Sequence, residues 1–296
     1  FNTTQVENFA NMFNNCTSLE LLDLTSFDTR KAFVEENIGG IFNNCTSDLR
    51  VFTNSSTWTI DMSSYSVNHN SVDGRLVAIT VYDATNYMQY YPICDNGVQL
   101  TTYADTVIDD NIHEKIFTAP TLPTSIMFGQ KWVDEQTDTD THARTNSLLE
   151  VNFVNVNNLT TMEAMFRRNF NLTKIDFYGT TKNVTNMYGT FASINSLSYI
   201  DLSNFNTKLV TNMSNMFSYC KGLKQLDVSH FDTQNVKDMS VMFNYCESIK
   251  ELDLSQWNTE NVTDIQRMFM DCRQLQSIDL SNFNMEKVTS IISLFH

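Results

Sequence analysis

The sequence predicts an α/β solenoid in which each coil contributes a short parallel strand and a short helix. Three observations predict this fold: a block of the form Leu-Asp-Leu-Ser recurs every 26 residues, an aromatic residue follows each block at a fixed distance, and the hydrophobic period changes once within each unit. A fixed period of this length is the signature of a repeat protein whose coils stack to share one core. The blocks begin at Ile200, Leu226, Leu252 and Ile278, and the aromatic residues are Phe205, Phe231, Trp257 and Phe283.

Each coil contains two hydrophobic patterns in succession. Leu226 and Val228 alternate with the polar Asp227, and this period of two predicts a short strand. The next apolar residues recur at i, i+3, i+6 and i+7, which predicts one stripe of a short helix. The stripe residues of this coil are Val236, Met239, Met242 and Phe243. An Asn-Thr or Asp-Thr pair before each predicted helix offers side-chain oxygens for a turn or a helix cap.

The repeat divides the chain into three parts. Repeat coils occupy residues 1–58, and the array resumes over 146–296, where it stops within a repeat. Residues 59–145 hold all three prolines and more than half of the 11 tyrosines, so we expect a β-rich, tyrosine-rich insert or irregular coils there. Residues 75–82 within it are rich in β formers and predict a strand. Because the chain begins with Phe and stops inside a repeat, we expect a piece of a longer protein, with any export signal or anchor outside it.

Composition excludes several classes of partner. The formal net charge is −15 and the sequence pI is near 4.6, and such a surface repels the phosphates of nucleic acids. No basic cluster suggests binding to an anionic membrane, and no apolar run approaches the roughly 20 residues that a membrane span needs. No glycine-rich phosphate loop is present, and we expect no cofactor.

One repeat carries a family signature almost whole. The segment Asp227-Val-Ser-His-Phe-Asp-Thr233, followed by Met242-Phe243-Asn-Tyr-Cys246, resembles the BspA-like leucine-rich-repeat surface proteins of bacteria. The resemblance covers about 1–52 and 149–296. The general leucine-rich pattern has Asn or Cys where this chain has Phe231 or Trp257, a departure that fits the BspA-like group. The resemblance implies a right-handed leucine-rich-repeat solenoid on a bacterial cell surface, used for adhesion to host proteins, mucus or other cells.

Five of the six cysteines share one repeat position, three residues after a recurrent Phe. They are Cys16, Cys45, Cys220, Cys246 and Cys272. Asn169 and Ile194 replace cysteine in two other coils, so we interpret the position as a partly buried structural ladder that needs no thiol chemistry. The close cysteine pairs of a zinc site are absent, and we predict neither a metal site nor a catalytic thiol. Cys94 stands alone and stays unassigned.

A column of aspartates accompanies the predicted strands. Stacked coils would align Asp176, Asp201, Asp227, Asp253 and Asp279 on one outer face. Three interpretations stay open: a solvated face whose carboxylates bond nearby N–H groups and hydroxyls, a site for cations or basic partner segments, and a glycosidase pair. We disfavour the third, because a flat column offers no pocket to raise one pKa.

The second candidate for ligand binding is the tyrosine-rich insert. Tyr87, Tyr90 and Tyr91 lie close together in the sequence and are interpreted either as packing residues or as contacts to a partner.

These observations favour a bacterial cell-surface adhesin region, outside the cell, that binds host extracellular matrix, mucin glycoproteins or other cell-surface proteins. The alternative is a structural stalk that holds another domain away from the surface. We do not expect an enzyme; a glycan hydrolase working through the aspartate column is the third hypothesis.

Overall fold

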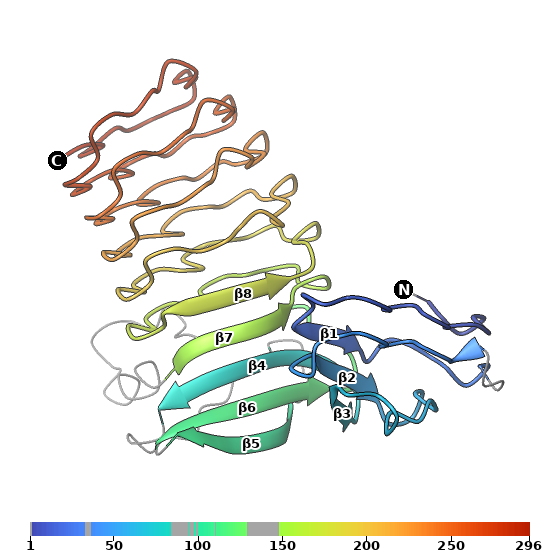
Figure 1. The fold of residues 1–296 in the computed structure, drawn as a ribbon. Helices are drawn as coiled ribbons and strands as arrows, with labels where there is room; N and C mark the ends of the chain where they lie inside the picture. The colour runs from blue at the N-terminus through green and yellow to red at the C-terminus, as the bar shows by residue number, and fades with distance from the viewer. Residues whose placement is uncertain are drawn as a thin grey trace. The chain divides into compact units, whose positions relative to one another are not determined.

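The computed structural model describes residues 2–32, 37–83, 94, 98, 100–109, 111–128 and 148–296 (Figure 1). The chain divides into two compact units. The first comprises Phe1–Val77, Thr101–Tyr103 and Ile116–Leu122, and the second comprises Ala78–Leu100, Ala104–Lys115 and Pro123–His296. The described residues form eight strands in two sheets and contain no α-helix.

The first sheet has three parallel strands in the order β1 (Leu21–Leu24), β2 (Arg50–Asn54) and β3 (Asn68–Val72). Successive coils of the chain therefore place one strand each side by side, as expected for a repeat protein. The apolar core beneath this sheet includes the buried Phe9, Phe27 and Phe42. Parallel strands covered by a shared core need no hairpin turns, and the connections run through irregular coils.

The second sheet has the strand order β5-β6-β4-β7-β8 and is mixed. Its strands are β4 (Arg75–Asp83), β5 (Thr101–Asp109), β6 (Ile112–Ala119), β7 (Leu148–Asn155) and β8 (Lys174–Tyr178). β4 pairs antiparallel with β7, and β7 pairs parallel with β8. The central strand β4 confirms the strand predicted at 75–82, and its run Leu76–Ile79 is fully buried, which is typical of a strand covered on both faces.

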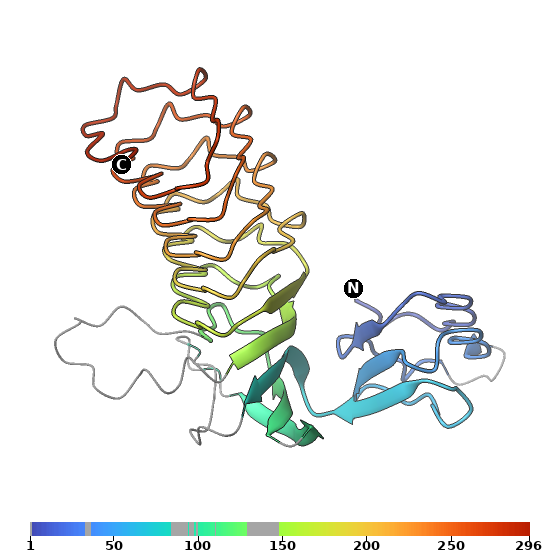
Figure 2. The same cartoon turned by 60° about the vertical axis from the view of Figure 1, so that its left-hand side comes forward.

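After β8 the strands shrink to isolated bridges between stacked coils. Figures 1 and 2 both show these coils lying one above another toward the C-terminus. Parallel bridges connect the coils at steps of 25 or 26 residues, along the column Thr161, Asn186, Asn212, Asp238 and Asp264. The strand predicted around Leu226–Val228 is reduced to a single bridge at Gln225.

The predicted helix of each coil is wrong, and the backbone conformation gives the reason. Where a helix was expected, Asn215 and Tyr219 have φ values of 58° and 60°. A left-handed residue every four positions prevents the i to i−4 hydrogen bonds of an α-helix. The other coils repeat this pair of left-handed positions, among them Val241 with Tyr245 and Arg267 with Asp271.

The amides of this segment alternate between two kinds of partner. The N–H groups of Met213, Asn215, Phe217 and Tyr219 donate to carbonyls of the next coil, at 2.7–2.9 Å. The intervening N–H groups, such as that of Met216, donate to the carbonyl three residues earlier and close four-residue turns within the coil. Every second amide thus bonds along the stack. The predicted α/β class and the right-handed leucine-rich-repeat solenoid with a helix per coil are wrong. The described residues are sheet-rich, contain no α-helix and include a stack of turn-rich coils.

The apolar stripe that suggested a helix is nonetheless the core of the stack. Val236, Met239, Met242 and Phe243 are all fully buried. The phenylalanine column stacks ring on ring, with centroids 5.7 Å apart between Phe217 and Phe243. The spacing therefore identified the buried residues correctly, while the backbone that buries them is a series of turns.

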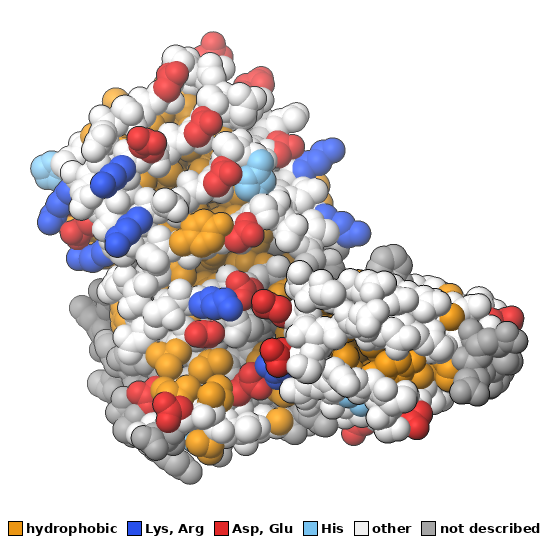
Figure 3. All heavy atoms as spheres, viewed as in Figure 1, with side chains coloured by type: hydrophobic (Ala, Val, Ile, Leu, Met, Phe, Trp, Pro, Cys, Tyr) orange, Lys and Arg blue, Asp and Glu red, His pale blue; other side chains and the backbone are white. Residues whose placement is uncertain are grey.

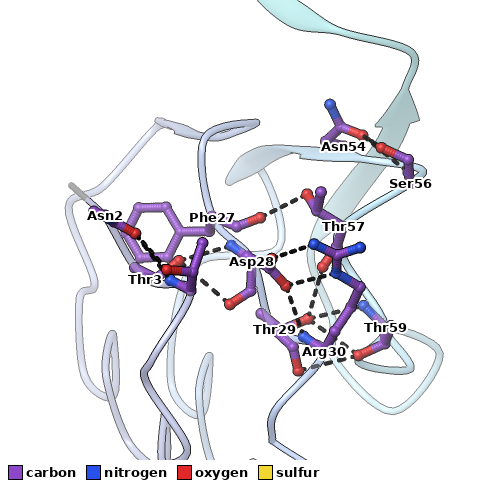
Figure 4. A network of polar contacts seen from close by, with 11 residues as sticks. Asn2, Thr3, Phe27, Asp28, Thr29, Arg30, Asn54, Ser56, Thr57 and Thr59 are labelled. Carbon is purple, nitrogen blue, oxygen red and sulfur yellow. Dashed lines mark hydrogen bonds and ion pairs between the residues drawn. The ribbon is translucent and has the colours of Figure 1, made fainter.

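The Asn-Thr and Asp-Thr pairs bond the coils together and do not cap helices. Thr207 is buried, and its Oγ1 donates to the Asp232 carbonyl of the next coil at 3.0 Å. The Asn206 amide donates in turn to Thr181 Oγ1 of the previous coil at 2.9 Å. The first unit uses the same arrangement, where Thr3 Oγ1 and the Asp28 backbone exchange two bonds (Figure 4).

Candidate interaction surface

The predicted aspartate column consists of side chains that close their own turns. Oδ1 of Asp227 accepts the Ser229 amide at 3.0 Å and the Ser229 hydroxyl at 2.7 Å. Asp201, Asp253 and Asp279 accept the amide two residues ahead in the same way, at 2.8–2.9 Å. Asp176 differs, because it forms an ion pair with Lys174 at 3.0 Å.

These bonds change the acidity of the carboxylates. The hydroxyl and amide of Ser229 lower the pKa of Asp227, and the corresponding serine groups lower the pKa of Asp201, Asp253 and Asp279. Asp23, at the same repeat position in the first unit, has a raised pKa because burial outweighs its bonds to Thr25. The role of these carboxylates in closing turns is enough to explain why aspartate recurs in each coil.

The cysteine column makes a bond between coils. Cys220, Cys246 and Cys272 each donate Sγ–H to the carbonyl of a phenylalanine in the previous coil, at 3.0–3.1 Å. Cys45 does the same to Phe13, whereas Cys16 belongs to the first coil. The side-chain amide of Asn169 donates to the Phe128 carbonyl. Asparagine can therefore replace cysteine because it supplies the same hydrogen-bond donor.

Burial also sets the reactivity of these thiols. Burial raises the pKa of Cys220 and of Cys272 to about 12, and raises that of Cys246 well above its usual value. Cys16, Cys45, Cys220, Cys246 and Cys272 form no disulfide bonds. A protonated thiol that donates to a backbone carbonyl is neither a nucleophile nor a metal ligand.

The predicted contact residues Tyr87, Tyr90 and Tyr91 lie outside the described residues.

Strands β4, β5 and β6 bring together a polar cluster that the sequence did not indicate. The Tyr82 hydroxyl donates to Asp105 at 3.0 Å, His113 Nδ1 lies 3.2 Å from Asp105 Oδ1, and the buried Lys115 lies 3.4 Å from Oδ2. Partial burial raises the pKa of Asp105, but these partners outweigh it and the net pKa is lowered. The cluster joins three strands and is a packing feature of the sheet.

An exposed aromatic and charged cluster lies at one corner of the C-terminal coils. We call it the coil-edge cluster, and it consists of Tyr219, Lys221, Tyr245, Glu247, Asp271 and Arg273. Tyr219 is 41% exposed and stacks on Tyr245 with ring centroids 4.6 Å apart. Both tyrosines occupy the left-handed position just before the buried cysteine, which turns their side chains outward.

Charged side chains of three consecutive coils surround this tyrosine pair. Lys221 Nζ lies 3.0 Å from Glu247 and 5.6 Å from the centroid of the Tyr245 ring. Arg273 lies 3.6 Å from Glu247 and 3.2 Å from Asp271, and hydrogen bonding to Asp271 raises the pKa of Tyr245. Lysine, glutamate and arginine at one repeat position therefore form a chain of ion pairs along the stack, and they fix the orientation of the aromatic rings.

A shallow groove of about 380 Å³ is formed by residues that lie close in the sequence to those of the coil-edge cluster. It is lined by Lys224, Gln225, Ser248, Lys250 and Gln274, and we call it the lysine groove. Figure 3 shows acidic side chains over the middle of the visible face of the stacked coils and basic side chains toward its margins. The chain, although acidic overall, thus keeps local basic surfaces.

Two further kinds of site are absent from the described residues. The described side chains contain no cluster of three or more His, Cys, Asp or Glu residues that could hold a metal ion. Within the same ranges, no helix has the length and hydropathy of a membrane span.

Comparison with protein families places the chain in one of them. A family model described as "Mycoplasma protein of unknown function, DUF285" matches residues 1–73, 139–251 and 185–296, which together cover more than three quarters of the chain. The chain belongs to the DUF285 family. No curated protein and no solved structure matches it.

The DUF285 matches follow the repeat. They include both coil regions, and two of them overlap within the C-terminal stack. The coil-edge cluster lies inside these matches and was missed at the sequence level. Its signal was present, since Tyr219 and Tyr245 are 26 residues apart and each precedes a column cysteine, but tyrosine beside an apolar stripe was not weighed as a surface residue.

Proposed function

We propose that this DUF285 chain is the recognition region of a BspA-like bacterial cell-surface adhesin. Its partners would be host extracellular-matrix proteins, mucin glycoproteins or other cell-surface molecules, and its location would be outside the cell. The repeat family and the near-complete signature at Asp227–Cys246 support this assignment. The observation that carries it is the coil-edge cluster, in which the exposed Tyr219 stacks on the half-buried Tyr245.

A stacked tyrosine pair in a fixed orientation, with one ring exposed, is suited to recognition. Tyrosine offers a large amphipathic contact area at a low cost in side-chain entropy. Here the Tyr219–Tyr245 stack and the ion pairs of Glu247 with Lys221 and Arg273 order the side chains before any partner arrives. Ordering in the free state reduces the entropic cost of binding.

The second candidate function is a spacer that holds another domain away from the surface. One observation favours it: the aspartate column is engaged in turns within its own coils, as in Asp227 with Ser229. Such residues recur because each coil must fold, and they need no partner. The spacer hypothesis predicts that surface substitutions leave every binding property unchanged.

Binding to immobilised mucin, fibronectin and fibrinogen separates the two functions. The test variant is Tyr219→Ser/Tyr245→Ser, and the matched control is Tyr178→Ser, an exposed tyrosine on β8 outside the cluster. We expect the double variant to lose at least about 10-fold in affinity for one of the three, corresponding to about 1.4 kcal/mol, while the control binds as wild type. Thermal unfolding of all three chains shows whether each variant folds. Absence of binding by the wild-type chain would favour the spacer.

The proposal assigns recognition and no catalysis to this chain. Turnover of mucin or peptidoglycan glycans that Asp227→Asn abolishes would contradict it and would indicate a glycan hydrolase.

A further inference from the structure

We propose that the lysine groove binds an anionic polysaccharide, with Lys224 and Lys250 holding its carboxylate or sulfate groups. The inference rests on the proposed recognition function and names the ligand class for one surface. Three features support it: the positions of the two lysines, the absence of ion pairs between them and any described residue, and the polar residues that line the groove.

The stack fixes both lysines at one repeat position. The Lys224 amide donates to the Ser198 carbonyl of the previous coil at 3.0 Å, and the Lys250 carbonyl accepts the Gln276 amide of the next coil at 3.0 Å. Ser248 Oγ donates to the Lys221 carbonyl at 2.7 Å and ties the groove to the neighbouring coil. Two ammonium groups therefore extend from adjacent, hydrogen-bonded coils, which suits a ligand with charges repeated along a chain.

The ammonium groups are available to a ligand. Neither Lys224 nor Lys250 forms an ion pair with any described residue, and both side chains are exposed. Glu247, the carboxylate of the adjacent corner, is already held between Lys221 and Arg273. A chain of net charge −15 repels anions in general, so an anion can approach only where cations gather.

The lining favours a sugar over a peptide. Besides the two lysines, it consists of two glutamines and a serine, whose amides and hydroxyl both donate and accept hydrogen bonds, as sugar hydroxyls require. A peptide site needs apolar pockets for anchoring side chains, and no apolar residue lines this groove. Tyr199, which is 56% exposed, forms a parallel bridge with Gln225, one of the lining residues.

Isothermal titration with defined polymers tests the inference. The probes are a heparin octasaccharide for sulfate, a hyaluronan oligosaccharide for carboxylate, neutral dextran, and a poly-glutamate peptide of matched charge. The test variant is Lys224→Gln/Lys250→Gln. The control is Lys208→Gln/Lys237→Gln, which removes the same charge from exposed lysines of the same stack outside the groove.

We expect one acidic oligosaccharide to bind the wild-type chain, at least 10-fold weaker binding by the groove variant, and a change below about 3-fold in the control. The affinity should fall as salt rises, because exposed charges are screened. Binding of poly-glutamate as tight as that of the sugars would overturn the proposal in favour of an acidic peptide. An equal loss of affinity in the groove variant and the control variant would also overturn it, because binding would then depend on net charge and not on the groove. If no polymer binds while mucin or fibronectin binding persists, the groove assignment fails and the recognition function stands.

Discussion

Asp23 and Asp253 occupy one repeat position but respond to pH in opposite directions. Serine hydroxyl and amide groups lower the pKa of Asp253, whereas burial raises the pKa of Asp23 above its ordinary value of 3.8. An aspartate with a lowered pKa contributes stability that is present above the unfolded pKa and is lost as pH falls through the folded pKa. An aspartate with a raised pKa contributes stability that is present below the unfolded pKa and is lost as pH rises through the folded pKa.

The pair predicts opposite effects of removing each charge. Asp253→Asn should lower the melting temperature at pH 7 and weaken the loss of stability below about pH 4, where carboxylates with pKa values below 3.8 take up protons. Asp23→Asn should leave the melting temperature at pH 7 unchanged or raise it, because the buried charge is gone while the acceptor for Thr25 stays. Thermal unfolding between pH 2.5 and 7 measures both. A lower melting temperature for Asp23→Asn at pH 7 would contradict the assigned burial cost.

The cysteine column predicts thiols that are inert in the folded chain. Because burial raises the pKa of Cys220 to about 12, less than about one thiol in a thousand is ionised at pH 8. Iodoacetamide at pH 8 should therefore label Cys220 and Cys246 only after unfolding in urea, whereas the less buried Cys16 serves as the internal control. Peptide mapping by mass spectrometry reads the sites. Rapid labelling of Cys220 in the native chain would show that its coil opens readily or that the thiol is ionised.

At the scale of the element, the left-handed positions decide the conformation of each coil. The first such position is held by Asn11 and Gly40 in the first unit and by Ala164, Gly189, Asn215, Val241 and Arg267 in the second. Glycine and asparagine tolerate this conformation, whereas a β-branched residue is strained there. Val241, with a φ of 61°, is therefore the most strained member of the column.

Relief of this strain is measurable. Val241→Asn should raise the free energy of unfolding by about 1 kcal/mol, because the left-handed conformation costs an ordinary residue about 1–2 kcal/mol while the amide can still donate to the Gln266 carbonyl. The matched control, Val107→Asn on β5, exchanges the same residues at an exposed strand position and should bring no gain. Urea unfolding compares the three chains. A less stable Val241→Asn variant would show that valine packing outweighs the strain.

The sequence predicted which residues are buried better than it predicted their backbone. Met239, Met242 and Phe243 recur at a spacing that a helix and a chain of turns can both place on one side, so periodicity could not separate the two. The distinguishing signal was glycine or asparagine at the first left-handed position, as in Gly40 and Asn215. This signal is weak in the sequence, because other coils hold residues at this position that rarely adopt the left-handed conformation. In those coils, contacts with the neighbouring coils enforce the conformation.

At the scale of the whole molecule, the stack converts short-range repeats into long continuous surfaces. Each coil bonds only to its neighbours, through alternate amides, threonine hydroxyls and column thiols, so a substitution acts first on adjacent coils. The sequence predicted this order along the chain from its 26-residue period. It did not predict the coil-edge cluster, because the pairing of Lys221, Glu247 and Arg273 depends on how far each coil is displaced from the next.

Besides the lysine groove, three surfaces compete for the recognition role, and one binding series separates them. The measurement is the affinity of the wild-type chain and of three variants for whichever of immobilised mucin, fibronectin and fibrinogen the wild-type chain binds. The variants are Tyr219→Ser/Tyr245→Ser at the coil edge, Asp201→Asn/Asp227→Asn/Asp253→Asn in the aspartate column, and Tyr87→Ser/Tyr90→Ser/Tyr91→Ser in residues 59–145. Substitution is preferred to deletion of 59–145, because β3 and β4 lie in that range and pair with β2 and β7. We predict that only the coil-edge variant loses binding, by at least about 10-fold. Loss in either other variant, with the coil-edge variant binding as wild type, would contradict the account.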